Sequence, residues 1–254
     1  MPDNSPPLFS IITVTYNASS TIAHTLASVD EQLFKSYEHL IIDGLSSDST
    51  LEIVKQYPSP LRTVISEADR GIYDAMNKGI SIAKGQYLIF LNSGDTFHTS
   101  DTLGTLARAI EQNNTPGIVY GQTQLVNPNR ERVADRHLTA PDVLTYKSFA
   151  NGMVVCHQAF VALRRIVPLY DLRYKYSADY DWCIQCLQHS RHNVLVPEIL
   201  IDYLDEGVTT ANHKASLKER FKIMCYYYGT FNTILHHLSF IPRYVKRKAA
   251  RLKQ

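Results

Sequence analysis

The sequence lacks the glycine-rich and histidine-rich motifs that mark several common enzyme classes. It has no G-x-x-x-x-G-K-[ST] phosphate loop and no G-x-G-x-x-G turn, so a P-loop NTPase and a dinucleotide-dependent dehydrogenase lose support. It also has no G-x-S-x-G elbow and no H-E-x-x-H pair, so an α/β-hydrolase and a zinc peptidase of that type lose support. Any nucleotide site in this chain must therefore work without a glycine-rich phosphate cradle.

Cysteine is scarce, with four residues among 254. Cys183 and Cys186 form a single C-x-x-C, but neither a second such pair nor two histidines at ligand spacing accompany it. The pair lies in a helical pattern over 180–189, where cysteine is commonly a small buried residue. No disulfide framework is indicated, so we expect a reducing compartment.

Long hydrophobic runs are also missing. No apolar stretch reaches the roughly 18 to 20 residues that a membrane-spanning helix needs. Residues 1–7 are short and polar, and 8–14 are too brief to form the apolar core of a signal peptide. We therefore expect a cytoplasmic protein unless another feature anchors it.

The net charge of +2 is divided unevenly along the chain. From residue 218 onward there are nine lysines and arginines and one acid, Glu219, so this segment carries +8 and residues 1–217 carry −6. The basic segment also contains several tyrosines and phenylalanines. The two parts of the chain are expected to face different partners.

Short apolar runs alternate with helical patterns in the first half of the chain. The strand-like runs are 8–14, 39–43, 61–66 and 86–91, and the helical segments between them are 22–33, 49–57 and 72–83. Alternation at this spacing predicts βαβ units, and hence an α/β fold with a largely parallel sheet flanked by helices.

The second half has a weaker pattern. Strands are expected at 118–126 and 153–163, with a turn at 127–130, a helix from near Ser177 or Asp179, and two helices over 214–240. We therefore expect one large domain over 1–215, with a nucleotide half (1–115) and an acceptor half (116–215), followed by a helical tail (216–254).

Polar residues follow each predicted strand of the first half. They are Thr15, Tyr16 and Asn17, then Asp43, then 67–70, and finally 92–95. In parallel sheets the ligand crevice lies beyond the carboxyl ends of the strands, so these positions predict one binding edge. Polar loops after strands are common in any case, so the placement alone does not establish a site.

Asp95 is the candidate metal ligand, because Mg²⁺ and Mn²⁺ prefer hard oxygen donors and a divalent cation can neutralise a diphosphate. Gly94 lets the backbone approach a phosphate closely. The same four residues, Asn-Ser-Gly-Asp, also make a good turn, so the motif alone leaves both interpretations open.

Several ordered blocks resemble those of the family 2 glycosyltransferases, and most closely the bacterial exopolysaccharide enzymes of the colanic-acid type. The blocks in the first half are S10-IITVTY-N17, I41-IDGLSSDS-T50, E67-ADRGIYDAMNKG-I80 and A83-KGQYLIFLNSG-D95. Those in the second half are C156-HQ-A159, Y176-SAD-Y180 and E206-GVTTA-N212. The resemblance covers about residues 8–215 and implies a GT-A fold, a nucleoside-diphosphate-sugar donor, a divalent metal and inversion at the anomeric carbon.

The resemblance also implies roles for residues of the first half. Thr15, Tyr16 and Asn17 would border the nucleoside base, and Asp43 would contact the base or ribose. Glu67, Asp69 and Asn77 would line the donor pocket. Asn92, Ser93, Gly94 and Asp95 occupy the place of the family's D-x-D-D signature, as donor-binding residues and, for Asp95, as the metal ligand.

Two departures from the family pattern reduce the number of carboxylates. The first and middle acids of the signature are Asn92 and Gly94 here, which leaves Asp95 alone. The paired acid that often follows the second strand is Asp43-Gly44. Both departures bear on metal affinity, although one carboxylate and a diphosphate can together hold Mg²⁺.

The same resemblance makes Asp179 the catalytic base, at the start of a helix, with Ala178 in place of a first acid. A base there would take the proton of the acceptor hydroxyl during attack on the anomeric carbon. Without the resemblance, Asp179 would be only a helix N-cap and Asp181 a first-turn acid. His157, Gln158 and Asp181 are candidate contacts for acceptor or donor sugar, although a lone histidine in an apolar strand is commonly a core residue.

The basic, aromatic tail suggests contact with an anionic membrane surface, at the cytoplasmic face of the inner membrane, where a lipid-linked glycan acceptor would be reached. No nucleic-acid recognition motif accompanies the tail, so we expect no nucleic acid partner. A solvated pair of packing helices is the plainer interpretation.

The hypothesis is an inverting glycosyltransferase of extracellular or capsular polysaccharide synthesis. A catalytically inactive GT-A module that binds a sugar nucleotide or glycan is the alternative, because the carboxylate signature is thinned. A nucleotidyltransferase would also be α/β and metal-dependent, but it leaves the blocks at 176–180 and 206–212 unexplained.

Overall fold

The computed structural model describes residues 5–136, 138–205 and 213–238. These residues form a nine-stranded mixed sheet with strand order β3-β2-β1-β4-β8-β6-β9-β5, and β7 pairs with β6. The strands are β1 (Phe9–Thr15), β2 (Tyr37–Asp43), β3 (Arg62–Ser66), β4 (Tyr87–Phe90), β5 (Thr96–Phe97), β6 (Ile118–Val126), β7 (Arg132–Asp135), β8 (Phe160–Leu163) and β9 (Asn193–Leu204).

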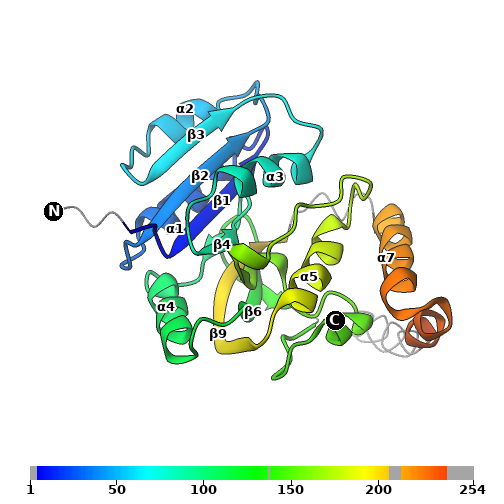
Figure 1. The fold of residues 1–254 in the computed structure, drawn as a ribbon. Helices are drawn as coiled ribbons and strands as arrows, with labels where there is room; N and C mark the ends of the chain where they lie inside the picture. Colours follow the sequence, from blue (N-terminus) through cyan, green and yellow to red (C-terminus); the bar gives the residue numbers. More distant parts are fainter. Residues whose placement is uncertain (1–4, 137, 206–212, 239–254) are drawn as a thin grey trace.

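The first four strands and their helices confirm the predicted βαβ pattern. Strands β1 to β4 are mutually parallel, in the order β3-β2-β1-β4, and Thr15 lies opposite Asp43 in the β1–β2 register. The helices between them are α1 (Ile22–Asp30), α2 (Thr50–Lys55) and α3 (Ile72–Ile82). Figure 1 shows this unit with its strands running in one direction.

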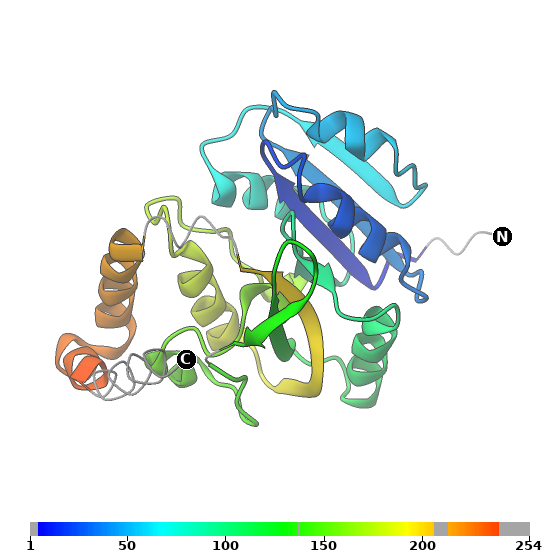
Figure 2. The same cartoon turned by 180° about the vertical axis from the view of Figure 1, so that it is seen from behind.

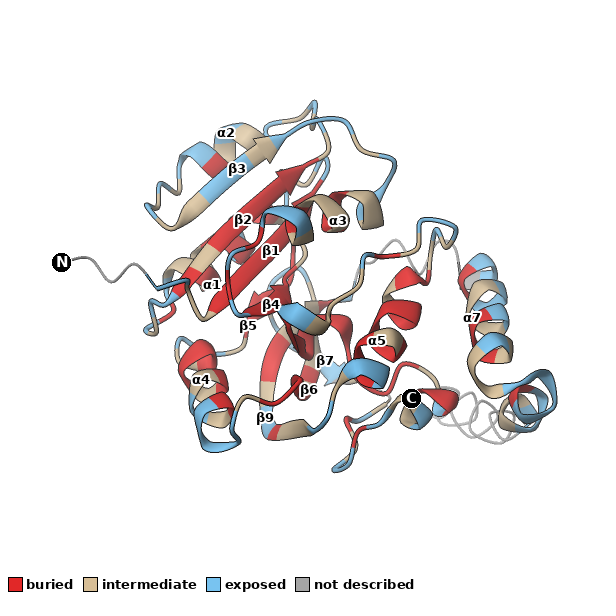
Figure 3. Ribbon diagram, viewed as in Figure 1, coloured by how far each residue is buried: buried red, intermediate tan, exposed pale blue. Residues whose placement is uncertain are grey.

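Alternating residues of the strands face two apolar layers. Ile12 and Val14 of β1 pack in the cluster that contains Met76 of α3, whereas Phe9 and Ile11 pack in the cluster that contains Leu106 of α4 (Thr102–Gln112). This period of two places helices on both faces, so β1, β2 and β4 are buried on both sides, whereas the edge strand β3 is exposed or half-buried (Figure 3).

The second half departs from the parallel pattern. Strand β8 is antiparallel to β4 and β6, whereas β6 and β9 are parallel to each other. The expected strand over 153–163 is wrong in its first part, where His157–Ala159 form the 3-10 turn η2 and only Phe160–Leu163 are strand. The expected turn at 127–130 is confirmed between β6 and β7.

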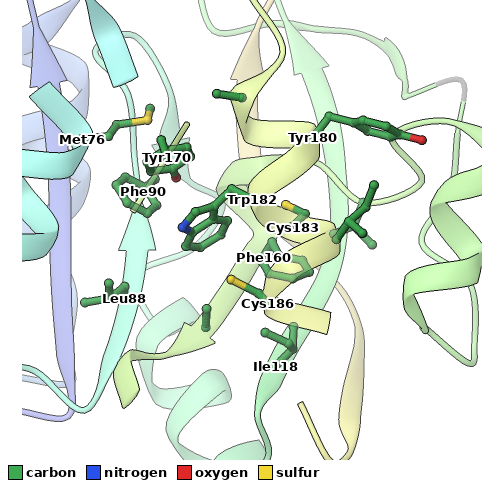
Figure 4. Close-up of a cluster of buried hydrophobic side chains, with 14 of the residues drawn as sticks. Met76, Leu88, Phe90, Ile118, Phe160, Tyr170, Tyr180, Trp182, Cys183 and Cys186 are labelled. Atoms are coloured by element: carbon green, nitrogen blue, oxygen red, sulfur yellow. The ribbon is translucent and has the colours of Figure 1, made fainter. Parts of the chain in front are cut away.

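Helix α5 (Ala178–His189) supplies the centre of the core in the second half. Trp182 is fully buried, stacks on Tyr170 with ring centroids 5.2 Å apart, and donates its indole N–H to the Pro168 carbonyl at 3.0 Å. Cys183 and Cys186 are buried beside it and carry no disulfide, as expected. Figure 4 shows both sulfur atoms among apolar side chains of this cluster.

Helix α7 (His213–Tyr228) lies on the side of α5 that faces away from the sheet, as Figures 1 and 2 show from opposite directions. Residues 230–238 form a further helical segment, so the two helices expected over 214–240 are present within the described residues. None of the described helices is long and apolar enough to cross a membrane. The rest of the predicted tail, 239–254, lies outside the described residues.

Candidate active site

The carboxyl ends of β1, β2, β3 and β4 bring the predicted donor residues to one edge of the sheet. Thr15 ends β1 and Asp43 ends the neighbouring β2, while Asn92 follows β4 on the other side of β1. Glu67 follows β3, and its backbone N–H donates to the Asp43 carbonyl at 3.0 Å. The structure therefore gathers these residues as the strand pattern predicted.

Two buried polar atoms at this edge have no hydrogen-bond partner among the described residues. They are Oγ1 of Thr15 and Oδ1 of Asn92. Thr15 is 6% exposed, and both residues stand at the ends of neighbouring parallel strands. Burying a polar atom without a partner costs about 1 to 3 kcal/mol, which a bound ligand with hydrogen-bonding groups would offset.

The Asp43 carboxylate is already engaged within the protein. It is fully buried, and its Oδ2 accepts hydrogen bonds from the Ser66 hydroxyl at 2.6 Å and the Ser46 backbone N–H at 3.0 Å. The Ser46 hydroxyl also bonds to its Oδ1. Asp43 therefore fixes the loop after β2 to the end of β3, and its contact with a nucleoside stays a prediction.

The next loop lies against the first two. The Asn17 side chain accepts from the Ser47 backbone N–H at 2.8 Å, and the Asn17 backbone adopts a left-handed φ of 48°. Tyr16 beside it is 65% exposed, so its ring is available to a base. A Cβ on Gly44 would lie 2.4 Å from Oδ2 of Asp69, so a side chain there would require the Asp69 carboxylate to move.

Asn77 and Glu67 both have partners within the protein, although the Glu67 side chain is also exposed. The Asn77 amide donates to the Tyr170 carbonyl at 3.0 Å and accepts from the Tyr170 N–H at 2.7 Å. Glu67 pairs with Lys78 at 2.8 Å. Asn77 thus holds the segment before α5 against α3, a role that its sequence position did not indicate.

The 92–95 turn is fixed from several sides. Gly94 has a left-handed φ of 102°, and its N–H donates to the Thr25 hydroxyl at 2.9 Å. Ser93 donates to the Val14 carbonyl at 3.2 Å. Arg130, from the β6–β7 turn, donates to the Gly94 carbonyl at 2.6 Å. The backbone of this turn therefore adopts a conformation that only glycine accepts readily.

Asp95 is buried and uses both carboxylate oxygens within the protein. Oδ1 accepts the Leu204 backbone N–H at 3.0 Å and Oδ2 accepts the Gln158 amide at 2.7 Å. Burial raises the pKa of Asp95 to about 7, against the opposing effects of these hydrogen bonds and of Arg130. Gln158 therefore supports Asp95, and its predicted contact with a sugar stays untested.

The described residues do not fit a metal centre held by the protein. No group of three or more His, Cys, Asp or Glu side chains with metal-binding geometry occurs in the described part of the chain. Asn92 and Gly94 bring no carboxylate, and Asp95 is enclosed by its two partners. A protein that holds Mg²⁺ by itself needs several oxygen ligands at one point, which this turn lacks.

Asp179 lies in the first turn of α5, close to α3. Its Oδ1 accepts a hydrogen bond from the Tyr73 hydroxyl at 3.1 Å. Burial raises the pKa of Tyr73 well above its ordinary value, and the Asp179 charge adds to this effect, so Tyr73 stays a donor at neutral pH. Tyr73 also stacks on Tyr170, with centroids 5.5 Å apart. The aromatic pair therefore orients the carboxylate.

The helix-cap interpretation of Asp179 does not match the observed helix boundary. Helix α5 begins at Ala178 with Ser177 as its N-cap residue, so Asp179 is a first-turn residue. The Ser177 hydroxyl contacts Ser216 of α7 rather than the helix backbone. A first-turn carboxylate is favoured by the helix dipole, but that position does not explain the hydrogen bond from Tyr73.

Asp181 and His157 have the contacts of core residues. Asp181 accepts from the Tyr227 hydroxyl at 2.9 Å and the Gln185 amide at 2.6 Å. His157 is 4% exposed, and its Nε2 lies 2.6 Å from the Tyr170 hydroxyl. Burial lowers the pKa of His157 to about 4. Direct contact of either residue with a sugar stays a prediction.

Comparison with known proteins identifies the class. The fold is that of GT-A enzymes: S. aureus TarS 1–349, solved with UDP-GlcNAc, superposes with a TM-score of 0.69 at 20% identity over 85% of this chain and 64% of that one. The mannosyltransferase PcManGT from Pyrobaculum calidifontis, solved with GDP-Man and Mn²⁺, superposes with a TM-score of 0.61 at 14% identity over 98% and 81% of the two chains.

Sequence relatives identify the family. Residues 10–167 match the family described as Glycosyl transferase family 2. A PGL/p-HBAD biosynthesis glycosyltransferase of Mycobacterium bovis is 31% identical over 83% of this chain and 79% of its own length. The amylovoran biosynthesis glycosyltransferase AmsB of Erwinia amylovora is 27% identical over 77% and 69%. The chain belongs to the family 2 glycosyltransferases.

The buried, neutral state of His157 generates a prediction about pH. The unfolded chain takes up a proton on this histidine near pH 6.5, whereas the folded chain does so only near pH 4. Stability is therefore lost as the pH falls from about 7 to 4, and this one group accounts for roughly 2 to 3 kcal/mol of the loss between pH 7.5 and 4.5. Urea unfolding of the parent and of His157→Gln at both pH values measures this effect. The unfolding free energy of the parent minus that of His157→Gln should be lower at pH 4.5 than at pH 7.5 by that amount. Parallel pH dependences of the two proteins would contradict the assignment.

Proposed function

We propose that this glycosyltransferase moves a sugar, with inversion, from a nucleoside-diphosphate sugar to a lipid-linked glycan acceptor in bacterial extracellular or capsular polysaccharide synthesis. The observation that carries the proposal is the pair of unpartnered buried atoms, Oγ1 of Thr15 and Oδ1 of Asn92, at the carboxyl ends of adjacent parallel strands. Support also comes from TarS and PcManGT, whose solved complexes contain UDP-GlcNAc and GDP-Man.

The acceptor class is supported by the sequence relatives. The M. bovis and E. amylovora proteins are named for PGL/p-HBAD and amylovoran biosynthesis, and the sequence blocks resemble exopolysaccharide enzymes of the colanic-acid type. The carboxyl ends of β1 to β4, with Thr15, Asp43 and Asn92, form the proposed donor site, which we call the donor edge. These strands belong to the first half of the chain, and Asp179 belongs to the second. The proposal therefore keeps a nucleotide half at 1–115 and an acceptor half at 116–215.

Asp179 is the group we assign as base. In the transfer, the acceptor hydroxyl oxygen bonds to the anomeric carbon, the bond from that carbon to the diphosphate oxygen breaks, and Asp179 takes the hydroxyl proton. The Tyr73 hydrogen bond occupies Oδ1 and fixes the rotamer of the carboxylate, which leaves Oδ2 for the acceptor. The nucleoside diphosphate leaves from the opposite face of the sugar.

A divalent cation belongs to the proposal only as an ion that arrives with the diphosphate. PcManGT was solved with Mn²⁺, but the 92–95 turn of this chain does not form a metal centre by itself. Phosphate oxygens and water commonly complete the shell of Mg²⁺. No step of the transfer is assigned to the ion.

The outer side of α7 supports docking on an anionic membrane surface. Lys214, Lys218, Lys222 and Tyr226 follow one another at intervals of four residues and are all exposed, so they form one stripe along the helix (Figure 3). Exposed apolar side chains continue in the next helical segment, at Phe231, Ile234, Leu235 and Leu238. Cations beside apolar groups suit the headgroup region of anionic lipid. With four free cysteines, this supports a place at the cytoplasmic face of the inner membrane.

Replacement of Thr15 tests the donor site. In Thr15→Val an unpartnered hydroxyl is exchanged for a methyl group of similar size, so the free energy of unfolding should stay equal or rise. The Kd for a nucleoside diphosphate should rise about fivefold, because one neutral hydrogen bond of roughly 1 kcal/mol is lost. Calorimetric titration with UDP, GDP and dTDP measures this effect, and Thr63→Val at an exposed site of β3 is the control. Repeating the titration with Mn²⁺ measures the contribution of the ion. Equal nucleotide affinity in both proteins would place the donor elsewhere.

Replacement of Asp179 tests the base. Asp179→Asn keeps the shape and the Tyr73 contact but cannot accept the proton, so turnover should fall roughly 10²- to 10⁴-fold while nucleotide affinity stays unchanged. Asp171→Asn, on the segment before α5, is the matched control and should retain activity. Full turnover in Asp179→Asn would remove the base assignment. Nucleotide binding without transfer by the unmodified chain would favour an inactive GT-A module.

Vesicle sedimentation tests the membrane proposal. Each lysine near an anionic surface contributes about 1 kcal/mol, so Lys214→Gln, Lys218→Gln and Lys222→Gln together should weaken binding roughly a hundredfold. Three exposed lysines of the first half, changed to glutamine, give a control of equal charge: Lys35, Lys55 and Lys84. Equal loss in both triple variants, or equal binding to neutral lipid, would show non-specific attraction. A second variant that ends at residue 240 measures how much residues 241–254 contribute to vesicle binding.

A further inference from the structure

Helix α7 is docked on the segment that carries the candidate base. The Ser216 hydroxyl lies 2.9 Å from that of Ser177, and the Tyr227 hydroxyl donates to Asp181 at 2.9 Å. The Glu219 carboxylate accepts the backbone N–H groups of Lys175 and Tyr176 at 3.0 and 2.8 Å. Contacts at intervals of three to four residues, from 216 to 227, place one whole face of α7 against the start of α5.

Arg220 lies on this face, and its charge has no anionic partner among the residues that the structure describes. Its guanidinium carbon lies 5.9 Å from the centre of the Tyr180 ring. Its buried Nε has no hydrogen-bond partner among the described residues. No ion pair of Arg220 occurs in the described part of the chain, and the neighbouring Glu219 is engaged with backbone N–H groups. A buried guanidinium nitrogen without an acceptor is costly, which indicates an anionic ligand.

Arg220 packs on the first turn of α5, the turn that also carries the candidate base Asp179. Tyr180 is the next residue after Asp179, and Figure 4 shows the Tyr180 ring at the first turn of α5, directed away from Trp182. The positive charge of Arg220 also lowers the pKa of Tyr73, which donates to Asp179, although burial of Tyr73 is the larger and opposite effect. Tyr73 contacts Asp179 and Arg220 contacts Tyr180, so both contacts are made on the first turn of α5.

If the proposed function holds, the Arg220 charge lies on the acceptor side of the reaction. In an inverting transfer the attacking oxygen and the leaving diphosphate are on opposite faces of the sugar, so a cation beside the base faces the acceptor. The described residues of α7 have four lysines and arginines against Glu219, a net charge of +3 with histidine neutral. Such a surface favours a doubly charged phosphate over a single carboxylate.

We propose that Arg220 binds a phosphate group of the acceptor beside Asp179, so that the enzyme recognises a glycan joined to a phosphate or diphosphate. The guanidinium plane stays on the Tyr180 ring, and Nε with a terminal nitrogen donates to two phosphate oxygens. By binding the acceptor phosphate, the Arg220 guanidinium positions the acceptor hydroxyl at Asp179. Arg220 itself lies outside the donor edge.

Calorimetric titration of the full chain with geranyl diphosphate, a prenyl diphosphate without a sugar or a base, tests the site. Arg220→Met keeps the aliphatic packing and removes the charge, so its Kd should rise at least tenfold. Arg220→Lys keeps the charge but not the bidentate fork, so its Kd should rise about fivefold. Arg173→Met, the same change at an exposed arginine, should leave the affinity unchanged. Near-ultraviolet circular dichroism of each variant verifies the fold around Trp182, and Arg220→Lys decides the question where Arg220→Met does not fold.

Titration with UDP and GDP distinguishes the source of the phosphate. If Arg220 faces the acceptor, the nucleotide affinities of Arg220→Met stay within twofold of the parent. A tenfold loss of nucleotide affinity would assign the phosphate to the donor and overturn the acceptor site. Undetectable binding of geranyl diphosphate to the parent, or equal binding to Arg220→Met, would also overturn it. Because both titrations measure binding alone, a failure of sugar transfer affects the proposed function and not this site.

Discussion

The buried carboxylate of Asp95 joins the two halves of the chain at the site. Its oxygens accept hydrogen bonds from Gln158 and from the backbone of Leu204, residues 63 and 109 positions further along the chain. Removing either partner would leave a buried polar group unsatisfied, so the turn after β4, the η2 segment and the end of β9 must form together. Asn92 and Gly94 belong to the same turn, so the position of these predicted donor residues depends on Asp95 even if no ligand contacts its carboxylate.

The first half of the fold was predictable because short-range sequence patterns determine its strands and helices. Short β-branched strands and helices with regular apolar spacing alternate from Phe9 to Phe90, and the parallel sheet follows from that alternation. Helix α4 was missed although Leu103, Leu106 and Ile110 have helical spacing. Strand β9 was obscured by Pro197, which removes a backbone donor, interrupts the apolar run and lies where the β6–β9 register shifts.

The positions of the candidate site residues were predictable, whereas their partners were not. Strand ends place Thr15, Asp43 and Asn92 together, because carboxyl ends of parallel strands share an edge. Whether a site side chain is free to bind a ligand depends on residues far away in the sequence. The Asn77 side-chain amide, for example, is hydrogen-bonded to the backbone of Tyr170, 93 residues away. Such pairings arise from packing of α3 against the second half, and no periodicity in either segment indicates them.

The 92–95 signature has only one carboxylate, and two arginines of the second half add positive charge to the site region. A donor turn with Asn92 and Gly94 in place of acids is less negative than a full signature, so it needs less positive charge to accept a diphosphate. Arg130 already lies at that turn, through the Gly94 carbonyl. At the first turn of α5, Arg220 adds a second cation that is partly buried and therefore weakly screened by salt. The two guanidinium groups therefore have different proposed partners: Arg130 lies at the turn that we assign to the donor diphosphate, and Arg220 packs on the helix that carries the proposed base and is assigned to the acceptor phosphate.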